Sequence, residues 1–186
     1  MLIMGIIVSA KGRGTMLALT HIETALTDAF REVSRGAPPS LYRAMRHAVF
    51  PTGGLVRPKV CVAVAQAIGV REPELNTSAA VALEFLHCAS LVHDDLPCFD
   101  DAGFRRGKPS VHRVFGEDLA VLVGDGLIAA AFQVVAQAPI GNPGAVAAVL
   151  KVLARALGPT RGLVAGQAWE AEPRAEIDTV HLYKTG

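Results

Sequence analysis

Four carboxylates and three cationic side chains lie within residues 94–108 of this chain. Asp94, Asp95, Asp100 and Asp101 belong to the segment DDLPCFDD, and Arg105-Arg106-Gly107-Lys108 follows shortly after it. Mg²⁺ prefers oxygen ligands and typically takes one or two carboxylates together with phosphate oxygens of a substrate. Arginine side chains match phosphate oxygens with paired N–H donors. The segment therefore predicts a site for a magnesium-bound diphosphate, and a solvated loop held by ordinary ion pairs is the simpler alternative.

The segment before the aspartates favours the site over the solvated loop. Residues 79–92 are mostly alanine, valine, leucine and phenylalanine, which predicts a buried helix. The carboxylates then lie at the end of a core helix, where charge is normally avoided. In an unbroken helix Asp94 and Asp101 would share a face, but Pro97 must kink or end the helix. Helix geometry alone leaves open whether Asp100 or Asp101 faces Asp94.

Further donors flank the segment. His87 lies two helical turns before Asp94 on the same predicted face, and Arg57 follows the break at Gly53-Gly54. These residues could extend a diphosphate site, although a buried histidine in a core helix also has ordinary packing roles.

The elements that must position these residues are helices. Apolar residues recur at helical spacing between breaks rich in proline and glycine, and sustained strand-like alternation is absent. The sequence predicts an all-α chain with an irregular extension over residues 1–15 and one domain over residues 16–186. The expected helices begin near residue 16 and then span 40–49, 58–69, 77 or 78 to at least 93, 116–137, 143–157, 159–170 and from about 178 onward.

Composition narrows the class of protein. The chain has 186 residues, of which 51% are hydrophobic and 19% are charged, so intrinsic disorder is excluded. A formal net charge of +1 and 5% aromatic residues predict no nucleic-acid partner. The apolar residues 1–10 are too few for a membrane span, which needs about 20 residues, so no span is expected. Three cysteines without framework spacing predict free thiols and a cytoplasmic location.

The series His87…Asp94-Asp95-Leu96-Pro97-Cys98-Phe99-Asp100-Asp101…Arg105-Arg106-Gly107 resembles the first aspartate-rich motif of the trans-isoprenyl diphosphate synthases. The DDxxxxD spacing with Leu-Pro inside it is similar to the bacterial farnesyl and geranylgeranyl diphosphate synthases. The similarity extends to Gly53-Gly54…Arg57-Pro58, Gly124-Asp125, Gly166-Gln167 and Lys184-Thr185-Gly186.

The resemblance implies an isoprenoid synthase-type helical bundle with a central cavity, here incomplete, that forms a homodimer when intact. It implies a Mg²⁺-dependent transferase that condenses isopentenyl diphosphate with an allylic diphosphate in isoprenoid biosynthesis. Ser90 and Ala89, before the aspartates, are small, and Phe85 is the next bulky side chain that could stop a growing chain. This pattern looks closer to geranylgeranyl than to farnesyl diphosphate synthesis.

Residue roles follow from the resemblance by matching position. Asp94 and Asp100 would hold Mg²⁺, and Arg105 would hold the allylic diphosphate. Isopentenyl diphosphate would be held by three residues: Arg57, His87 and Arg106. Lys184 and Thr185 would lie along the allylic substrate, with Gln167 near the same cavity, and Lys184 would share the catalytic role with Asp94, Asp100 and Arg105.

Two departures from the family pattern support an alternative hypothesis. The family's GGKRxRP motif is one residue shorter here, where Gly53-Gly54-Leu55-Val56-Arg57-Pro58 lacks the lysine. The sequence also stops at Lys184-Thr185-Gly186, before the family's second aspartate-rich motif. The alternative is therefore a C-terminally truncated, catalytically crippled chain, or a non-catalytic partner subunit of a full-length synthase.

Overall fold

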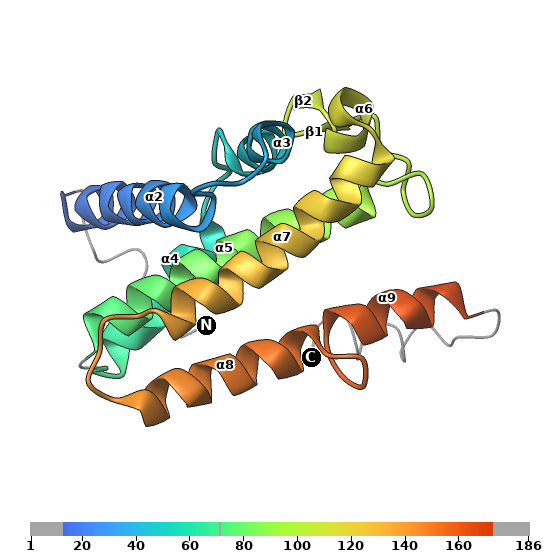
Figure 1. The fold of residues 1–186 in the computed structure, drawn as a ribbon. Coiled ribbons are helices and arrows are strands. Elements are labelled where there is room, and N and C mark those ends of the chain that lie inside the picture. The colour runs from blue at the N-terminus through green and yellow to red at the C-terminus, as the bar shows by residue number, and fades with distance from the viewer. Residues whose placement is uncertain (1–12, 71, 173–186) are drawn as a thin grey trace. The chain divides into compact units, whose positions relative to one another are not determined.

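The computed structural model describes the backbone of residues 13–70 and 72–172, and side chains from His21 onward within these ranges. The chain divides into two compact units at the junction of Ile140 and Gly141, and each unit is described by itself. The described residues are almost entirely helical (Figure 1), so the all-α class that the sequence predicts is confirmed.

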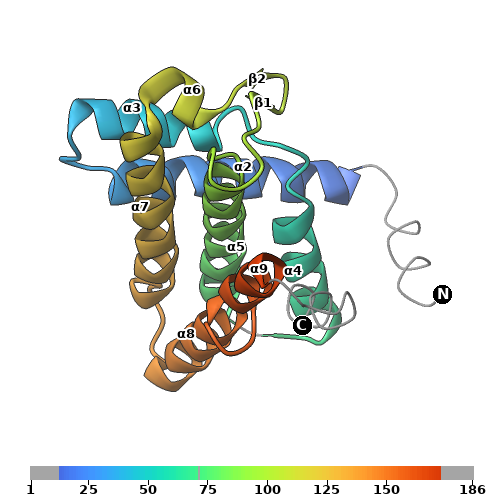
Figure 2. The ribbon, with the colours of Figure 1, turned by 90° about the vertical axis from the view of Figure 1, so that its right-hand side faces the viewer.

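The first unit is built around two long helices that lie side by side, α5 and α7 (Figures 1 and 2). Helices α2, α3 and α4 pack against this pair, and a short hairpin and helix α6 connect α5 to α7. The elements of this unit are α2 (Arg13–Val33), α3 (Pro39–Val49), α4 (Val56–Ala67), α5 (Pro73–Asp94), β1 (Phe104–Arg105), β2 (Lys108–Pro109), α6 (Val111–Phe115) and α7 (Glu117–Ala136).

The core of this unit lies where α5 meets its neighbours. Phe85 of α5 and Leu127 of α7 are fully buried, and Leu26 of α2 is buried in the same unit. Phe30 of α2 packs edge-on against Phe50, with ring centroids 5.4 Å apart. Burial of such side chains is the main favourable term in folding, and each contributes about 1.5–3 kcal/mol. The helix that carries the candidate site is therefore the most firmly embedded element of the unit.

The starts of α5 and α3 differ from the sequence expectation. Helix α5 begins at Pro73, about one turn before the expected start at residue 77 or 78. A proline is well tolerated in the first helical turn, and Glu74 interacts favourably with the helix dipole there. Helix α3 begins at Pro39, so Ser40 is not its cap; the Ser40 hydroxyl instead accepts a hydrogen bond from Arg43 at 3.3 Å.

The loop after α5 contains a hairpin and a short helix that the sequence pattern did not predict. Strands β1 and β2 pair antiparallel through a two-residue turn at Arg106-Gly107. Both turn residues have positive φ, 51° and 75°, as a type I′ hairpin turn requires. Two-residue strands are too short for apolar alternation to reveal, so only the glycine marks this turn in the sequence.

The second unit contains α8 (Pro143–Leu157) and α9 (Leu163–Ala171). The bounds of α8 agree with the expected 143–157, and the Asn142 side chain accepts a hydrogen bond from the Ala145 backbone at 3.2 Å. Helix α9 begins later than the expected residue 159 because the chain still turns at Gly162. Most of the expected extension 1–15 and the helix expected from about 178 lie outside the described residues.

Two helices, α5 and α7, are long and apolar enough to cross a membrane by length and composition alone. In α5, 56% of the apolar stretch is buried inside the structure, and in α7 39%. The core helices of soluble proteins meet the same criteria, and these two helices pack against each other. The expectation that the chain has no membrane span stays a prediction.

Close packing of α5 on α7 generates a stability prediction at Gly124. A Cβ at Gly124 would overlap the His93 ring, which hydrogen-bonds the Val121 carbonyl at 3.2 Å, whereas a Cβ at Gly126 would lie 3.7 Å from the Met45 sulfur. Replacing glycine with alanine inside a helix stabilises the fold by about 1 kcal/mol through helix propensity at either position. At Gly124 this gain is opposed by overpacking, which typically costs about 1–3 kcal/mol of stability.

Gly126→Ala is therefore expected to be neutral or stabilising, and Gly124→Ala to be less stable than Gly126→Ala by at least about 1 kcal/mol. Urea unfolding monitored by circular dichroism measures both free energies of unfolding. Equal values for the two variants would contradict the packing argument.

Candidate functional site

The acidic segment folds back onto the end of α5. Asp94 is the last residue of the helix, and the backbone N–H of Asp100 donates a hydrogen bond to the Asp94 carbonyl at 2.9 Å. The Asp101 N–H donates to the Leu96 carbonyl at 3.1 Å. These bonds close the turn that Pro97 begins, and they bring Asp100 next to Asp94 although the helix has ended between them.

Asp101 turns toward α6 instead. Its carboxylate accepts a hydrogen bond from Arg113 at 2.8 Å and lies 3.7 Å from Nε2 of His112. Its backbone has a positive φ of 48°, a conformation that costs energy for a residue with a side chain. Asp101 therefore fixes the loop to α6, and Asp100 keeps an exposed position.

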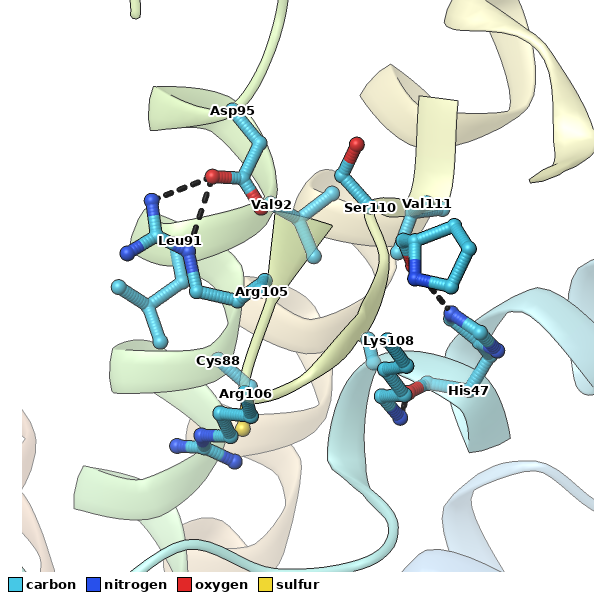
Figure 3. Close-up of a pocket in the computed structure, with 12 residues that line it drawn as sticks. His47, Cys88, Leu91, Val92, Asp95, Arg105, Arg106, Lys108, Ser110 and Val111 are labelled. Atoms are coloured by element: carbon cyan, nitrogen blue, oxygen red, sulfur yellow. Dashed lines mark hydrogen bonds and ion pairs between the residues drawn. The ribbon is translucent and has the colours of Figure 1, made fainter. Parts of the chain in front are cut away.

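Asp95 and Arg105 form the central ion pair of the loop. The Asp95 side chain is only 3% exposed, and its Oδ1 accepts hydrogen bonds from Nε of Arg105 at 2.9 Å and from Nη2 (Figure 3). This hydrogen bond is the largest cause that raises the pKa of Arg105, to which Asp94 and Asp100 add through their charges. Arg105 is thus a permanent cation among three carboxylates.

The carboxylate oxygens of the loop are the kind of ligand that Mg²⁺ prefers. Within the described residues, no group of three or more histidine, cysteine, aspartate or glutamate side chains is arranged to hold a metal ion. Mg²⁺ usually binds through one or two carboxylates and takes its remaining ligands from water and substrate phosphates. A pair of carboxylates such as Asp94 and Asp100, beside a cation that can hold a phosphate, suits that arrangement.

A second group of charges lies around His87, which is two turns before Asp94 on α5. The pKa of His87 is lowered to about 4, first by burial and then by the positive charges of Arg57, Arg106 and Arg105. The imidazole is therefore neutral at neutral pH, and three guanidinium groups from α4 and the hairpin are close enough to act on it. This cluster is cationic although the whole chain is nearly neutral.

Lys108 is turned away from this cluster. Its ammonium group donates a hydrogen bond to the carbonyl of His47 (Figure 3). It donates another to the carbonyl of Phe50 at 2.6 Å, also at the C-terminal end of α3. Burial, followed by the charge of Arg106, lowers the pKa of Lys108. Of the three cations that follow the aspartates, Lys108 anchors the hairpin to α3, and Arg105 and Arg106 face α5.

Two cavities lie near these residues. The cavity between α5, the hairpin and α3 (Figure 3) has a volume of about 20 Å³, room for little more than a water molecule. An open groove of about 550 Å³ runs along α4 from Arg57 to Ile68 and includes Leu83 of α5, with a lining that is almost wholly apolar. Only the groove has the size of a ligand site.

Residues upstream of Asp94 divide between two faces of α5. Ser90 is half-buried and lies one turn before Asp94, on the same face as His87. Ala89 and Phe85 are 1% and 0% exposed and belong to the packed core. Of the two small residues before the aspartates, Ser90 is therefore the partly exposed one, and the roles expected of Ala89 and Phe85 beside a growing chain stay predictions.

The structure brings six of the nine expected site residues into the first unit. These are Arg57, His87, Asp94, Asp100, Arg105 and Arg106. Gln167 is half-buried on α9 in the second unit, and Lys184 and Thr185 lie outside the described residues.

Two buried carboxylates were not among the predicted site residues. Asp95 holds Arg105, and Glu84, only 2% exposed, lies 3.4 Å from Arg106. A glutamate inside the apolar stretch AAVALEFLHCASLV was the sequence signal for the second of these pairs, because buried carboxylates require partners.

The lowered pKa of His87 predicts a pH dependence of stability. The unfolded histidine titrates near pH 6.5 and the folded one near pH 4, so between these values the unfolded chain binds more protons. His87 therefore contributes a loss of stability as the pH falls from about 6.5 to 4. We expect His87→Gln to lose less stability over this range than the wild type.

Urea unfolding at pH 7 and pH 4.5 measures this difference. His21→Gln, at an exposed position on α2, is the matched control for loss of an imidazole. The same pH dependence in the wild type and in His87→Gln would refute the expectation.

Known proteins resemble this chain over most of its length. The family model described as Polyprenyl synthetase matches residues 38–186. Geranylgeranyl diphosphate synthase of Cereibacter sphaeroides is 47% identical over 170 residues, covering 89% of this chain and 58% of that protein. The geranylgeranyl diphosphate synthase of Rhodobacter capsulatus is 46% identical over 167 residues, with the same two coverages.

The fold agrees with that similarity. The crystal structure of a geranyltransferase from Legionella pneumophila matches with a TM-score of 0.78 at 30% identity, covering 92% of this chain and 64% of that one. This chain spans a little over half the length of the curated relatives that it matches. The matched residues include the acidic loop, the hairpin and the helices that position them, and the chain belongs to the polyprenyl synthetase family.

Proposed function

We propose that this chain is a Mg²⁺-dependent prenyltransferase that joins isopentenyl diphosphate to an allylic diphosphate and yields geranylgeranyl diphosphate. The observation that carries the proposal is that two groups of charges lie at the C-terminal part of α5: Asp94 and Asp100 with Arg105, and the arginines of α4 and the hairpin around His87. The relatives named geranylgeranyl diphosphate synthases support the choice of product.

The carboxylate end of the site would receive the allylic diphosphate. Asp94 and Asp100 would hold Mg²⁺, and Arg105 would bind the same diphosphate with guanidinium N–H groups that Asp95 does not use. The arrangement supports this role because Asp95 fixes the arginine at Nε and Nη2. When bound, Mg²⁺ supplies charge that neutralises the diphosphate oxygens as the group departs.

The cationic end would receive isopentenyl diphosphate. Arg57 and Arg106 would bind its phosphate oxygens as charged donors, and the neutral His87 would donate a single hydrogen bond. Charge-assisted hydrogen bonds of this kind are about twice as strong as neutral ones. The family's lysine is absent from the sequence here, so these three residues would carry more of the binding than the motif usually requires.

The reaction balances without an oxidant. The allylic carbon–oxygen bond breaks, a new carbon–carbon bond forms to isopentenyl diphosphate, and one proton leaves the new chain. The side chains of this site would bind and orient the two diphosphates in fixed positions, and such preorganised electrostatics is usually the largest catalytic contribution. Gln167, Lys184 and Thr185 would complete the allylic site.

Further parts of the proposal draw on the family resemblance together with single features of the chain. Ser90, small and on the face of Asp94, would leave room for a chain longer than farnesyl. A homodimer, a cytoplasmic location and the absence of a nucleic-acid partner are proposed with the activity. The three free cysteines support a reducing compartment.

The alternative, a crippled chain or a non-catalytic partner subunit, draws its support from the exposed side of α4. Val56, Val60, Val64 and Ile68 are 51–72% exposed and follow one another at helical spacing. The comparisons favour the enzyme, because the relatives and the solved structure reported above carry the names of enzymes.

The proposal predicts that diphosphate binding at the acidic loop depends on Mg²⁺. The double variant Asp94→Ala/Asp100→Ala is expected to bind a non-hydrolysable allylic thiolodiphosphate at least about tenfold more weakly than the wild type in the presence of Mg²⁺, because hydrogen bonds and charge contacts to ions are worth about 1.5–3 kcal/mol. Isothermal titration calorimetry with and without Mg²⁺ measures both affinities.

The matched control is Asp28→Ala/Glu32→Ala, which removes two exposed carboxylates from α2. It is expected to bind like the wild type. Equal affinities for the wild type and the Asp94/Asp100 variant would reject the assignment of this loop as the allylic diphosphate site.

A further inference from the structure

A carboxylate is buried in the middle of the apolar helix α5. Glu84 is 2% exposed and lies three residues before His87 on the helix. Its Oε1 accepts a hydrogen bond from Nη2 of Arg106 at 3.4 Å, and the Cys88 thiol lies 3.9 Å away. Burying a charge without a partner is strongly unfavourable, so the arginine is the group that makes this position tolerable.

The backbone of the Gly53-Gly54 break also lies close to Arg106. A Cβ at Gly53 would lie only 3.0–3.2 Å from the atoms of the Arg106 guanidinium group. The arginine side chain is 21% exposed and passes beside Cys88 (Figure 3). The guanidinium group is therefore close to both a carboxylate on α5 and a glycine before α4.

The backbone of Arg106 is fixed as well. Its φ is +51° in the hairpin turn, and Lys108 ties the same hairpin to the carbonyls at the end of α3. A left-handed arginine costs energy, and such costs persist only where the surrounding contacts enforce them. The hairpin backbone and the Glu84 carboxylate both restrict the guanidinium group, whose positive charge helps to lower the pKa of His87.

We propose that Glu84 is a positioning residue that holds Arg106, together with the bare Gly53 backbone, in the orientation needed to bind the diphosphate of isopentenyl diphosphate. The inference rests on the proposed function, in which Arg106 is a ligand of that substrate. Glu84 itself does not touch the substrate. It acts by removing the rotamer freedom of the arginine before binding.

Charge and position predict opposite effects, which makes the proposal testable. If Glu84 mattered only as a negative charge near an anion site, Glu84→Gln would strengthen binding of an anionic ligand, because a repulsive charge disappears. If Glu84 positions Arg106, the same variant frees the arginine and weakens binding. A glutamine keeps the size of the side chain, so packing is conserved, but it replaces the charge-assisted hydrogen bond that holds Arg106 with a weaker neutral one.

The experiment measures two affinities of the full chain by calorimetry: isopentenyl diphosphate without Mg²⁺, and the allylic thiolodiphosphate with Mg²⁺. The variants are Glu84→Gln, Arg106→Gln and the double variant. We expect Glu84→Gln to weaken isopentenyl diphosphate by about tenfold or more, within the range for a lost charge-assisted hydrogen bond, and to leave the allylic ligand within about twofold. In the Arg106→Gln background, Glu84→Gln is expected to have no further effect.

Other outcomes separate the possible failures. If the wild type binds isopentenyl diphosphate and Glu84→Gln binds it equally or more tightly, the positioning role is overturned and the proposed function stands. An equal loss of both ligands, or a loss that persists in the Arg106→Gln background, also overturns it, because Glu84 then acts through the whole fold. If the wild type does not bind isopentenyl diphosphate, both the proposed function and this inference are rejected.

A second variant keeps the test decisive if Glu84→Gln does not fold. Gly53→Ala leaves Glu84 in place and adds a Cβ only 3.0–3.2 Å from the Arg106 guanidinium group, which must then shift. It is expected to weaken isopentenyl diphosphate selectively, while Gly54→Ala, where a Cβ would make an ordinary contact at 3.5 Å with Val56, is the matched control. Equal binding by both glycine variants would overturn the inference.

Discussion

The positions of the charged side chains in this site follow from one constraint: α5 is a core helix, yet it carries carboxylates. Its apolar residues pack against α7 and α4, so a carboxylate on or at the end of this helix loses its water and must find a partner. Glu84 and Asp95 meet this requirement with Arg106 and Arg105, two consecutive residues of one hairpin. The helix therefore dictates where the hairpin lies, and the hairpin in turn supplies the cations.

The hairpin has enough anchors for that task. Lys108 donates hydrogen bonds to the carbonyls at the end of α3. In the loop before the hairpin, Asp101 accepts a hydrogen bond from Arg113 of α6. The charges of Lys108, Asp101 and Arg113 thus hold the fold of the loop together. Asp94, Asp100, Arg57 and His87 remain at the surface of the unit or only half-buried, where a ligand can reach them. The acidic loop is thus a mixture of scaffold and site, and neighbouring aspartates belong to different parts of it.

Membership in the polyprenyl synthetase family gives this arrangement a chemical purpose. In the proposed function two diphosphates would bind by different means, one through a hard metal ion held by a pair of carboxylates and the other directly through a group of arginines. The buried carboxylates of Asp95 and Glu84 each accept a hydrogen bond from a different arginine, so the two guanidinium groups have separate partners.

The sequence by itself determined the helical class, most helix positions and the residue types of the site. These follow from local rules, because helical periodicity, proline and glycine breaks and motif spacing act within a few turns. Helix geometry could not tell which of Asp100 and Asp101 lies beside Asp94, and no local pattern reveals that Lys108 binds the end of α3 or that Ala89 is buried in the core. Tertiary structure decided these points, and it also paired Glu84 with Arg106. Such pairings depend on where a hairpin packs against distant helices, and no periodicity along the chain encodes that placement.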